Sequence, residues 1–180
     1  MKAFVFLADG FEEIEAIAPI DILRRADIEV MTVSVSTDKT VRGAHGISVI
    51  ADQLFSEADF SIMDLLILPG GMPGTANLDA HSGLKNLIRK HLEQNKKTGA
   101  ICAAPSILGK IGLLEGKEAI CYPGFENQLL GATLSDKKVV KSGEIITAKG
   151  AGVALEFAFK LVEELKGKGV ANRVSDSICF

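Results

Sequence analysis

The chain is poor in the residues that build metal sites and disulfide scaffolds. It has three cysteines and three histidines: Cys102, Cys121 and Cys179, and His45, His81 and His91. No CxxC pair occurs and no histidine lies beside a cysteine, which argues against a disulfide framework and against a zinc site. Because the histidines are scattered, their spacing predicts no metal site.

Positive charge is also scarce, since 20 lysines and arginines stand against 23 aspartates and glutamates, for a net charge of −3. The basic residues are scattered, so we expect neither nucleic acid nor an anionic membrane as a partner. Long apolar runs are missing as well. Ala3–Ala8 is too short for a secretory signal, and no later run reaches membrane-spanning length. We therefore expect a cytoplasmic protein.

What the chain does contain is a regular alternation of apolar, β-rich runs with helical patterns. The predicted strands are Ala3–Ala8, Glu29–Val35, Leu65–Leu68, a run that ends at Cys102, Glu118–Cys121, Lys138–Lys141 and Ile145–Ala148. The predicted helices are Glu12–Ala26, Ser82–Asn95, a short one that ends near Ile111, and Gly152–Lys166, with a hairpin across Val41–Ala51. Residues 4–7 and 65–68 are apolar on both faces, as in a parallel sheet covered by helices on each side. The 180 residues therefore predict one α/β domain, 1–180, folded as a doubly wound three-layer α/β/α sandwich.

Cys102 is the first candidate for chemistry. Residues 98–105, Thr-Gly-Ala-Ile-Cys-Ala-Ala-Pro, run from an apolar strand through small residues into a helical pattern. A thiol at such a turn faces the positive end of a helix dipole and unpaired backbone N–H groups, which favour the nucleophilic thiolate. The carboxyl end of a central strand is also where open α/β sheets place their sites. A small buried core cysteine is the alternative.

Three glutamates, Glu12, Glu13 and Glu15, open the first predicted helix. Acids in the first turn complement the helix dipole, which explains Glu12 and Glu13 without any function. Glu15 shares its helix face with apolar residues at i+3, i+4 and i+7, so we expect its carboxyl to be buried. Burial would raise its pKa and keep it protonated near neutrality, where it can donate a hydrogen bond to a thiolate and move protons. An ordinary, partly exposed acid is the alternative.

A glycine-rich segment, residues 69–74, follows the predicted strand Leu65–Leu68 at its carboxyl end. Glycines there, Gly70 and Gly71, let backbone N–H groups approach a bound oxygen closely, so the loop could form part of an oxyanion or anion site. It is not a phosphate loop, because the Lys-Ser/Thr ending is missing. A tight turn that requires glycine is the alternative.

These motifs together resemble the ThiJ/PfpI superfamily, in its Parkinsonism-associated deglycase and glyoxalase branch. The resemblance covers essentially the whole chain, and it rests on Phe6–Glu15, Leu68–Gly71, Ala100–Pro105, Tyr122-Pro123 and Gly150–Gly152, in the family's order. It implies a flavodoxin-like fold, of the type also found in class I glutamine amidotransferases, and a homodimer. It further implies that Cys102 is the reactive nucleophile and Glu15 the protonated carboxyl beside it. The backbone amides of Gly71 and Ala103 are then the oxyanion site.

The resemblance also places Arg24 and His45 in a pocket across the dimer interface, and Tyr122 and Pro123 beside the cysteine. Two residues depart from the family's patterns. Ala103 stands where the intracellular protease branch has histidine, which disfavours peptidase activity. Tyr122 stands where many relatives in this branch carry histidine, and a phenol with a pKa of about 10 is a poor base at neutrality although it can donate a hydrogen bond. The buried glutamate would then carry most of the proton transfer.

The expected activity is that of a glyoxalase or deglycase, a lyase or hydrolase that needs neither metal nor organic cofactor. Cys102 adds to the aldehyde of methylglyoxal or glyoxal, or of their protein adducts, to form a hemithioacetal, and Glu15 moves the protons. A non-catalytic redox sensor or stress-response chaperone, with Cys102 oxidised to sulfinate, needs the same two groups and is the alternative. Turnover separates these two. A cysteine peptidase is the third and disfavoured hypothesis.

Overall fold

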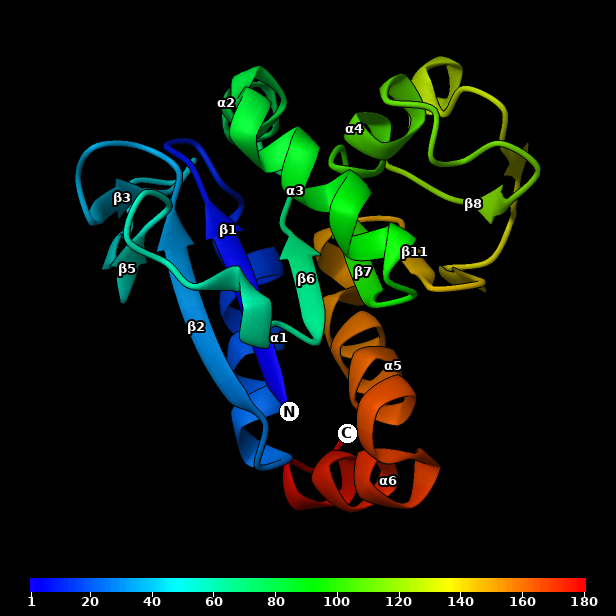
Figure 1. Cartoon of the computed structure of the whole chain (residues 1–180). Helices are drawn as coiled ribbons and strands as arrows, with labels where there is room; N and C mark the ends of the chain where they lie inside the picture. The colour runs from blue at the N-terminus through cyan, green and yellow to red at the C-terminus, as the bar shows by residue number, and fades with distance from the viewer.

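A seven-stranded sheet forms the centre of the computed structural model, which describes residues 1–180 (Figure 1). In spatial order its strands are β10 (Val139–Ser142), β11 (Ile145–Ala148), β7 (Lys97–Ile101), β6 (Leu65–Leu68), β1 (Lys2–Leu7), β2 (Glu29–Ser34) and β5 (Gln53–Leu54). All neighbouring strands are parallel except β10 and β11, which are antiparallel. The chain winds from β1 to β2 on one side and then to β6 on the other, so the order of the strands reverses at β1.

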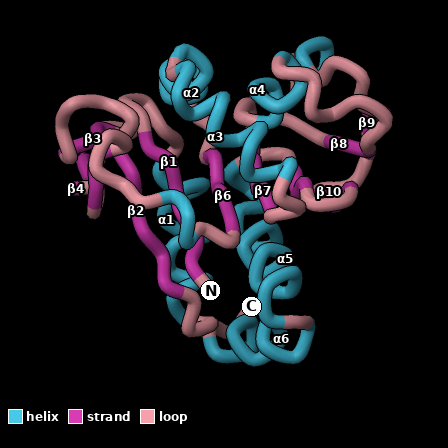
Figure 2. The backbone as a smooth tube through the Cα atoms, in the orientation of Figure 1, coloured by secondary structure: helices cyan, strands magenta, loops and turns pink.

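Helices cover both faces of the sheet (Figure 2). One face carries α1 (Glu13–Arg25), α5 (Ala154–Lys166) and α6 (Lys168–Ser177), and the other carries α2 (Gly74–Ala80), α3 (Ser82–Glu93) and α4 (Pro105–Lys110). Alternation along β1 explains the two cores, because Val5 and Leu7 pack against the first set of helices while Phe4 and Phe6 pack against the second. The predicted doubly wound three-layer sandwich is confirmed.

Some predicted elements differ from those observed. The predicted hairpin forms β3 (Thr40–Arg42) and β4 (Ser48–Ile50), which pair as a separate two-stranded sheet. The strand predicted at Glu118–Cys121 is only β8 (Glu118–Ala119), and it pairs with β9 (Thr133–Leu134) outside the main sheet. Helices α2 and α6 were not predicted. Both bury few apolar side chains, so few apolar positions mark them in the sequence. Short 3₁₀ turns, η1 (Phe60–Ile62), η2 (Glu126–Gln128) and η3 (Ala151–Val153), complete the chain.

The parallel strands β1, β6 and β7 end at the same edge of the sheet, next to α2 and α4 (Figure 1). The loops that follow these strands hold the candidate catalytic residues. Both chain termini lie toward the opposite end of the molecule (Figure 1). This is the edge at which open α/β sheets place their sites. None of the helices combines the length and the apolar character that crossing a membrane requires.

Candidate active site

Cys102 lies in the turn between β7, which ends at Ile101, and α4, which begins at Pro105, as the sequence predicted. Its backbone has a φ of 64°, in the left-handed region that non-glycine residues rarely adopt. Two hydrogen bonds fix this conformation: the Cys102 N–H donates to the Ala148 carbonyl at 2.9 Å, and the Cys102 carbonyl accepts from the Tyr122 N–H at 2.7 Å. Such a backbone conformation is uncommon and clusters at functional sites.

Glu15 is fully buried at the start of α1, which confirms the predicted burial of its carboxyl. Its Oε2 accepts a hydrogen bond from the Gly70 N–H at 2.9 Å, and its Oε1 is buried without a hydrogen-bond partner. Burial raises the pKa of Glu15 to about 7, although the neighbouring Cys102 side chain and the Gly70 amide lower it in part. Near neutrality this carboxyl is therefore close to half protonated.

Gly70 lets the cysteine and the glutamate come together. A Cβ atom at position 70 would lie 2.6 Å from Cys102 Cβ and 2.7 Å from Glu15 Oε2, so both side chains flank the space that glycine leaves free. Gly71 follows with a φ of 90°, and its backbone amide is directed at the Cys102 thiol, as is the amide of Ala103. The glycine-rich loop thus serves two purposes, close approach of the carboxyl and presentation of an N–H group.

Burial, followed by the charge of ionised Glu15, raises the pKa of Cys102 to about 12, and the amides of Gly71 and Ala103 lower it only in part. The direction is opposite to that predicted from the helix end, because loss of water and the carboxylate outweigh the two amides. The two groups are close enough to titrate as a coupled pair, in which burial raises the pKa of both. While the pair holds one proton, Cys102 is a thiolate only when that proton is on Glu15.

The thiol opens into a cavity of about 330 Å³. The cavity is lined by Glu12, Glu15, Gly71, Met72, Cys102, Ala103, Tyr122, Phe125 and Ala151. Two carboxyls and the thiol form its polar part, while the larger side chains form an apolar wall. The ring of Tyr122 is half exposed and lies over Gly150, where an added Cβ would be 3.2 Å from Tyr122 Cδ2.

The remaining predicted site residues are spread over neighbouring regions. Pro123 lines an adjacent cavity with Gly150 and Gly152 instead of the one at Cys102. Arg24 does not line the Cys102 cavity: its guanidinium donates to the Val30 carbonyl at 3.2 Å, and it lines a separate cavity between α1 and the strands β2 and β4. The predicted role of Arg24 across a dimer interface stays a prediction.

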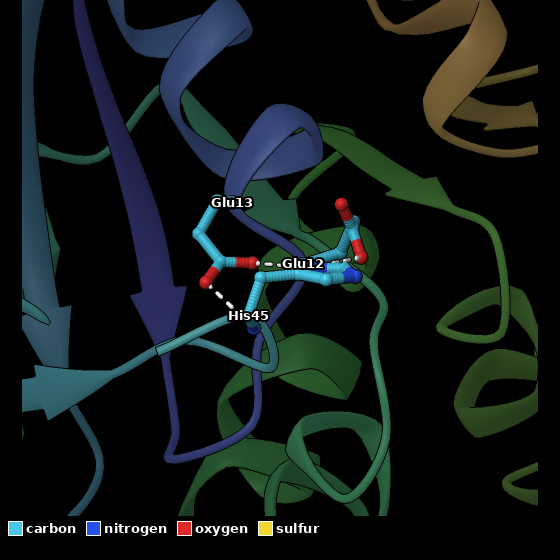
Figure 3. A group of neighbouring side chains, drawn as sticks. All are labelled: Glu12, Glu13 and His45. Carbon is cyan, nitrogen blue, oxygen red and sulfur yellow. Dashed lines mark hydrogen bonds and ion pairs between the residues drawn. The ribbon is translucent and has the colours of Figure 1, made fainter. Parts of the chain in front are cut away.

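His45 approaches the site only through neighbouring glutamates. Its Nδ1 lies 2.9 Å from Glu13 Oε2 and 3.5 Å from Glu12 Oε2, and Glu12 in turn lines the cavity (Figure 3). The hydrogen bond with Glu13 raises the pKa of His45. From the sequence, Glu12 was explained by the helix dipole and was not placed in the cavity. Phe125 was also missed, which lines the cavity and comes directly after the Tyr-Pro-Gly segment.

Fold and site together define a doubly wound α/β protein with a cysteine–glutamate pair at the carboxyl edge of its sheet. Residues 1–164 match the model of the DJ-1/PfpI family. The chain belongs to this family.

Relatives extend over nearly the whole chain. Protein DJ-1 homolog A of Arabidopsis thaliana is 41% identical over 172 residues, 94% of this chain, but the chain spans only 44% of that protein's length. The glutathione-independent glyoxalase DJR-1.2 of Caenorhabditis elegans is 32% identical over 94% of this chain and 90% of its own length. Among solved structures, oxidized DJ-1 of Toxoplasma gondii has a TM-score of 0.96 at 37% identity, covering 99% of this chain and 98% of its own.

Proposed function

We propose that the chain is a cofactor-independent glyoxalase or deglycase that acts on methylglyoxal, glyoxal or their protein adducts. The observation that carries the proposal is the Cys102–Glu15 pair, a thiol and a carboxyl that share a proton near pH 7 at the base of a cavity. A relative whose name describes a glutathione-independent glyoxalase supports the same reaction class. General acid–base catalysis works best when the pKa of the catalytic group lies near the working pH.

The first step is addition of the sulfur to the aldehyde carbon. The S–H bond breaks, a C–S bond forms, the proton passes to Glu15, and the oxygen that becomes negative faces the amides of Gly71 and Ala103. Glu15 then returns its proton to that oxygen, which gives the hemithioacetal. The C–H proton of the former aldehyde carbon then moves to the neighbouring carbon, and the hydroxyl proton moves to the ketone oxygen, which converts the hemithioacetal into a thioester. Water releases lactate from the methylglyoxal product and restores the thiol.

The size of the cavity suits a small aldehyde and leaves additional space around it. A volume of about 330 Å³ corresponds to roughly ten water molecules, since each occupies about 30 Å³ in the liquid. Methylglyoxal fits with space to spare, and the open side leaves room for the side chain of a modified protein. Tyr122 stands at the wall as a hydrogen-bond donor for a substrate oxygen.

The test is consumption of methylglyoxal with formation of lactate by reduced protein without added cofactor. Cys102→Ser and Glu15→Gln should each abolish turnover, whereas Cys179→Ser, a change at an exposed cysteine far along the chain, should leave it intact. Lack of multiple turnovers by the intact, reduced protein, or full activity in Glu15→Gln, would overturn the proposal.

A redox sensor is the second candidate, and a solved relative described as oxidized favours it. In this role Cys102 reacts with peroxide to a sulfinate held by the Gly71 and Ala103 amides, and it reacts once instead of cycling. A peptidase has the least support, because no histidine lines the cavity around Cys102. Stoichiometric oxidation without turnover would select the sensor.

We also propose that the chain forms a homodimer. Ile14 and Ile17 on α1 and Ile50 on β4 are exposed, and Ile17 and Ile50 line one cavity together with Arg24. Large apolar side chains gathered on one face indicate a protein interface. Light scattering on a sizing column should show a dimer that Ile50→Glu converts to a monomer, while Ile62→Glu, at an exposed isoleucine elsewhere, does not. A monomeric unmodified chain would contradict this.

A further inference from the structure

Glu12, Glu13 and His45 come together outside the cysteine–glutamate pair (Figure 3). The two glutamates open the first turn of α1, and His45 lies in the turn between β3 and β4, more than thirty residues along the chain. One carboxylate oxygen from each glutamate and one imidazole nitrogen all lie within 4.8 Å of one another. Sequence spacing could not reveal this group, because it depends on the β3–β4 hairpin folding back onto α1.

The structure holds Glu13 in a fixed orientation. Its side chain is almost fully buried, and its Oε1 accepts hydrogen bonds from the backbone N–H groups of His45 at 2.8 Å and Ile47 at 3.3 Å. Its Oε2 is left to face His45 Nδ1 at 2.9 Å. Gly43 makes room for this arrangement, because a Cβ there would collide with the Glu13 carboxylate. Partners that orient a ligand in this way are typical of metal sites.

We propose that Glu12 Oε2, Glu13 Oε2 and His45 Nδ1 bind a divalent transition-metal cation of the zinc type at the rim of the Cys102 cavity. One imidazole and two carboxylates are ligands that Zn²⁺ accepts, and three protein ligands leave a fourth position for water. With neutral imidazole, the two carboxylates carry a charge of −2 that balances the cation. The site is separate from the Cys102–Glu15 pair, and its ligands take no part in the reaction proposed above.

An ion pair between protonated His45 and Glu13 is the competing explanation for the cluster. It accounts for the 2.9 Å contact with Glu13, but it does not require Glu12, whose Oε2 lies 3.5 Å from the same nitrogen. A metal ion requires all three. Glu12 is therefore the most informative position to change, and its substitution also spares the backbone hydrogen bonds that Glu13 accepts.

The experiment is calorimetric titration of the full reduced chain with Zn²⁺ alone, accompanied by the visible spectrum with Co²⁺. We expect one equivalent to bind and both Glu12→Gln and His45→Gln to weaken binding by at least about tenfold, since losing even an outer-shell partner costs about 10- to 100-fold in affinity. Matched controls are Glu57→Gln, at an exposed carboxylate, and His81→Asn, which keeps a side chain able to cap α3. Both should bind as the unmodified chain does.

Three results would overturn the proposal. The first is absence of Zn²⁺ binding, and the second is unchanged affinity in Glu12→Gln and His45→Gln. The third is a thiolate-to-cobalt charge-transfer band that disappears in Cys102→Ser, which would place the ion on the cysteine. Thermal unfolding of Glu12→Gln should match that of the unmodified chain, so weaker binding by this variant reports on the ligand and not on the fold.

Discussion

The raised pKa of Glu15 predicts a stability cost that grows with pH and that Glu15→Gln should remove. The native carboxyl titrates at about 7, against 4.5 for an ordinary glutamate, because it is buried. Between these values the native chain binds more protons than the unfolded chain. The free energy of unfolding therefore falls as the pH rises through this window, with the full stability present below about pH 4.5 and the full cost reached above about pH 7.

The size of the effect follows from the two pKa values. Each pKa unit is worth about 1.4 kcal/mol, so the difference between 4.5 and about 7 corresponds to roughly 3 kcal/mol. The cost is the same whichever member of the pair keeps the last proton, because it depends only on where the native pair loses its first one. For a domain of this size, a loss of about 3 kcal/mol is a large part of the total stability.

Urea unfolding of the reduced protein at pH 4.5 and pH 8 measures this term when the unmodified chain is compared with Glu15→Gln. The comparison is needed because several other carboxyls have lowered pKa values and act in the opposite direction: Glu13, Asp59, Glu118 and Glu164. Relative to Glu15→Gln, the unmodified chain should lose about 3 kcal/mol between the two pH values. Glu57→Gln, at an exposed carboxylate, should show no such difference from the unmodified chain. If the two proteins differ in their free energy of unfolding by the same amount at pH 4.5 and at pH 8, the pKa of Glu15 is not raised.

Three further outcomes follow from the same geometry. Mass spectrometry can follow the rate at which iodoacetamide alkylates Cys102 as the pH is varied. In the unmodified chain this rate should rise through pH 7, whereas in Glu15→Gln the rise near pH 7 should be absent. A rate that does not change with pH in the unmodified chain would contradict the shared proton. Gly70→Ala should lower the free energy of unfolding in urea by about 1–3 kcal/mol and slow the alkylation of Cys102, because the added Cβ would lie 2.6 Å from Cys102 Cβ. An unchanged free energy of unfolding and alkylation rate would show that the loop can move aside. Phe157→Ala should cost about 3–5 kcal/mol, because this ring is fully buried on the sheet, and a smaller loss would mean that the core can close around the gap.

The sequence predicted the fold well where its signal was a continuous apolar strand. Residues 4–7 and 65–68 are apolar at every position, and the structure uses this by packing alternate side chains into two cores. It predicted poorly where an element depends on its neighbours. Helix α6 buries only Ala171 and Val174 against the rest of the molecule, so few apolar positions mark it in the sequence. The short strand β8 exists only because β9 pairs with it.

The candidate site shows the same division. The positions of Cys102 and Glu15 followed from local rules, a strand-to-helix turn and a helix face. The direction of the cysteine's pKa did not, because it depends on burial and on a carboxyl 87 positions away in the chain. Likewise, the sequence placed His45 in a pocket only through the family resemblance, and only the folded hairpin brings it to Glu12 and Glu13.

The shared proton also determines how the two candidate functions exclude each other. A sulfinate at Cys102 is an anion at neutral pH, and it would add a fixed negative charge beside Glu15. A neighbouring like charge raises the pKa of a carboxyl, so Glu15 would stay protonated well above pH 7 and could no longer accept the proton that aldehyde addition releases. Oxidation therefore removes the nucleophile and the base together. On either proposal, a molecule whose Cys102 is oxidised therefore cannot act as a glyoxalase.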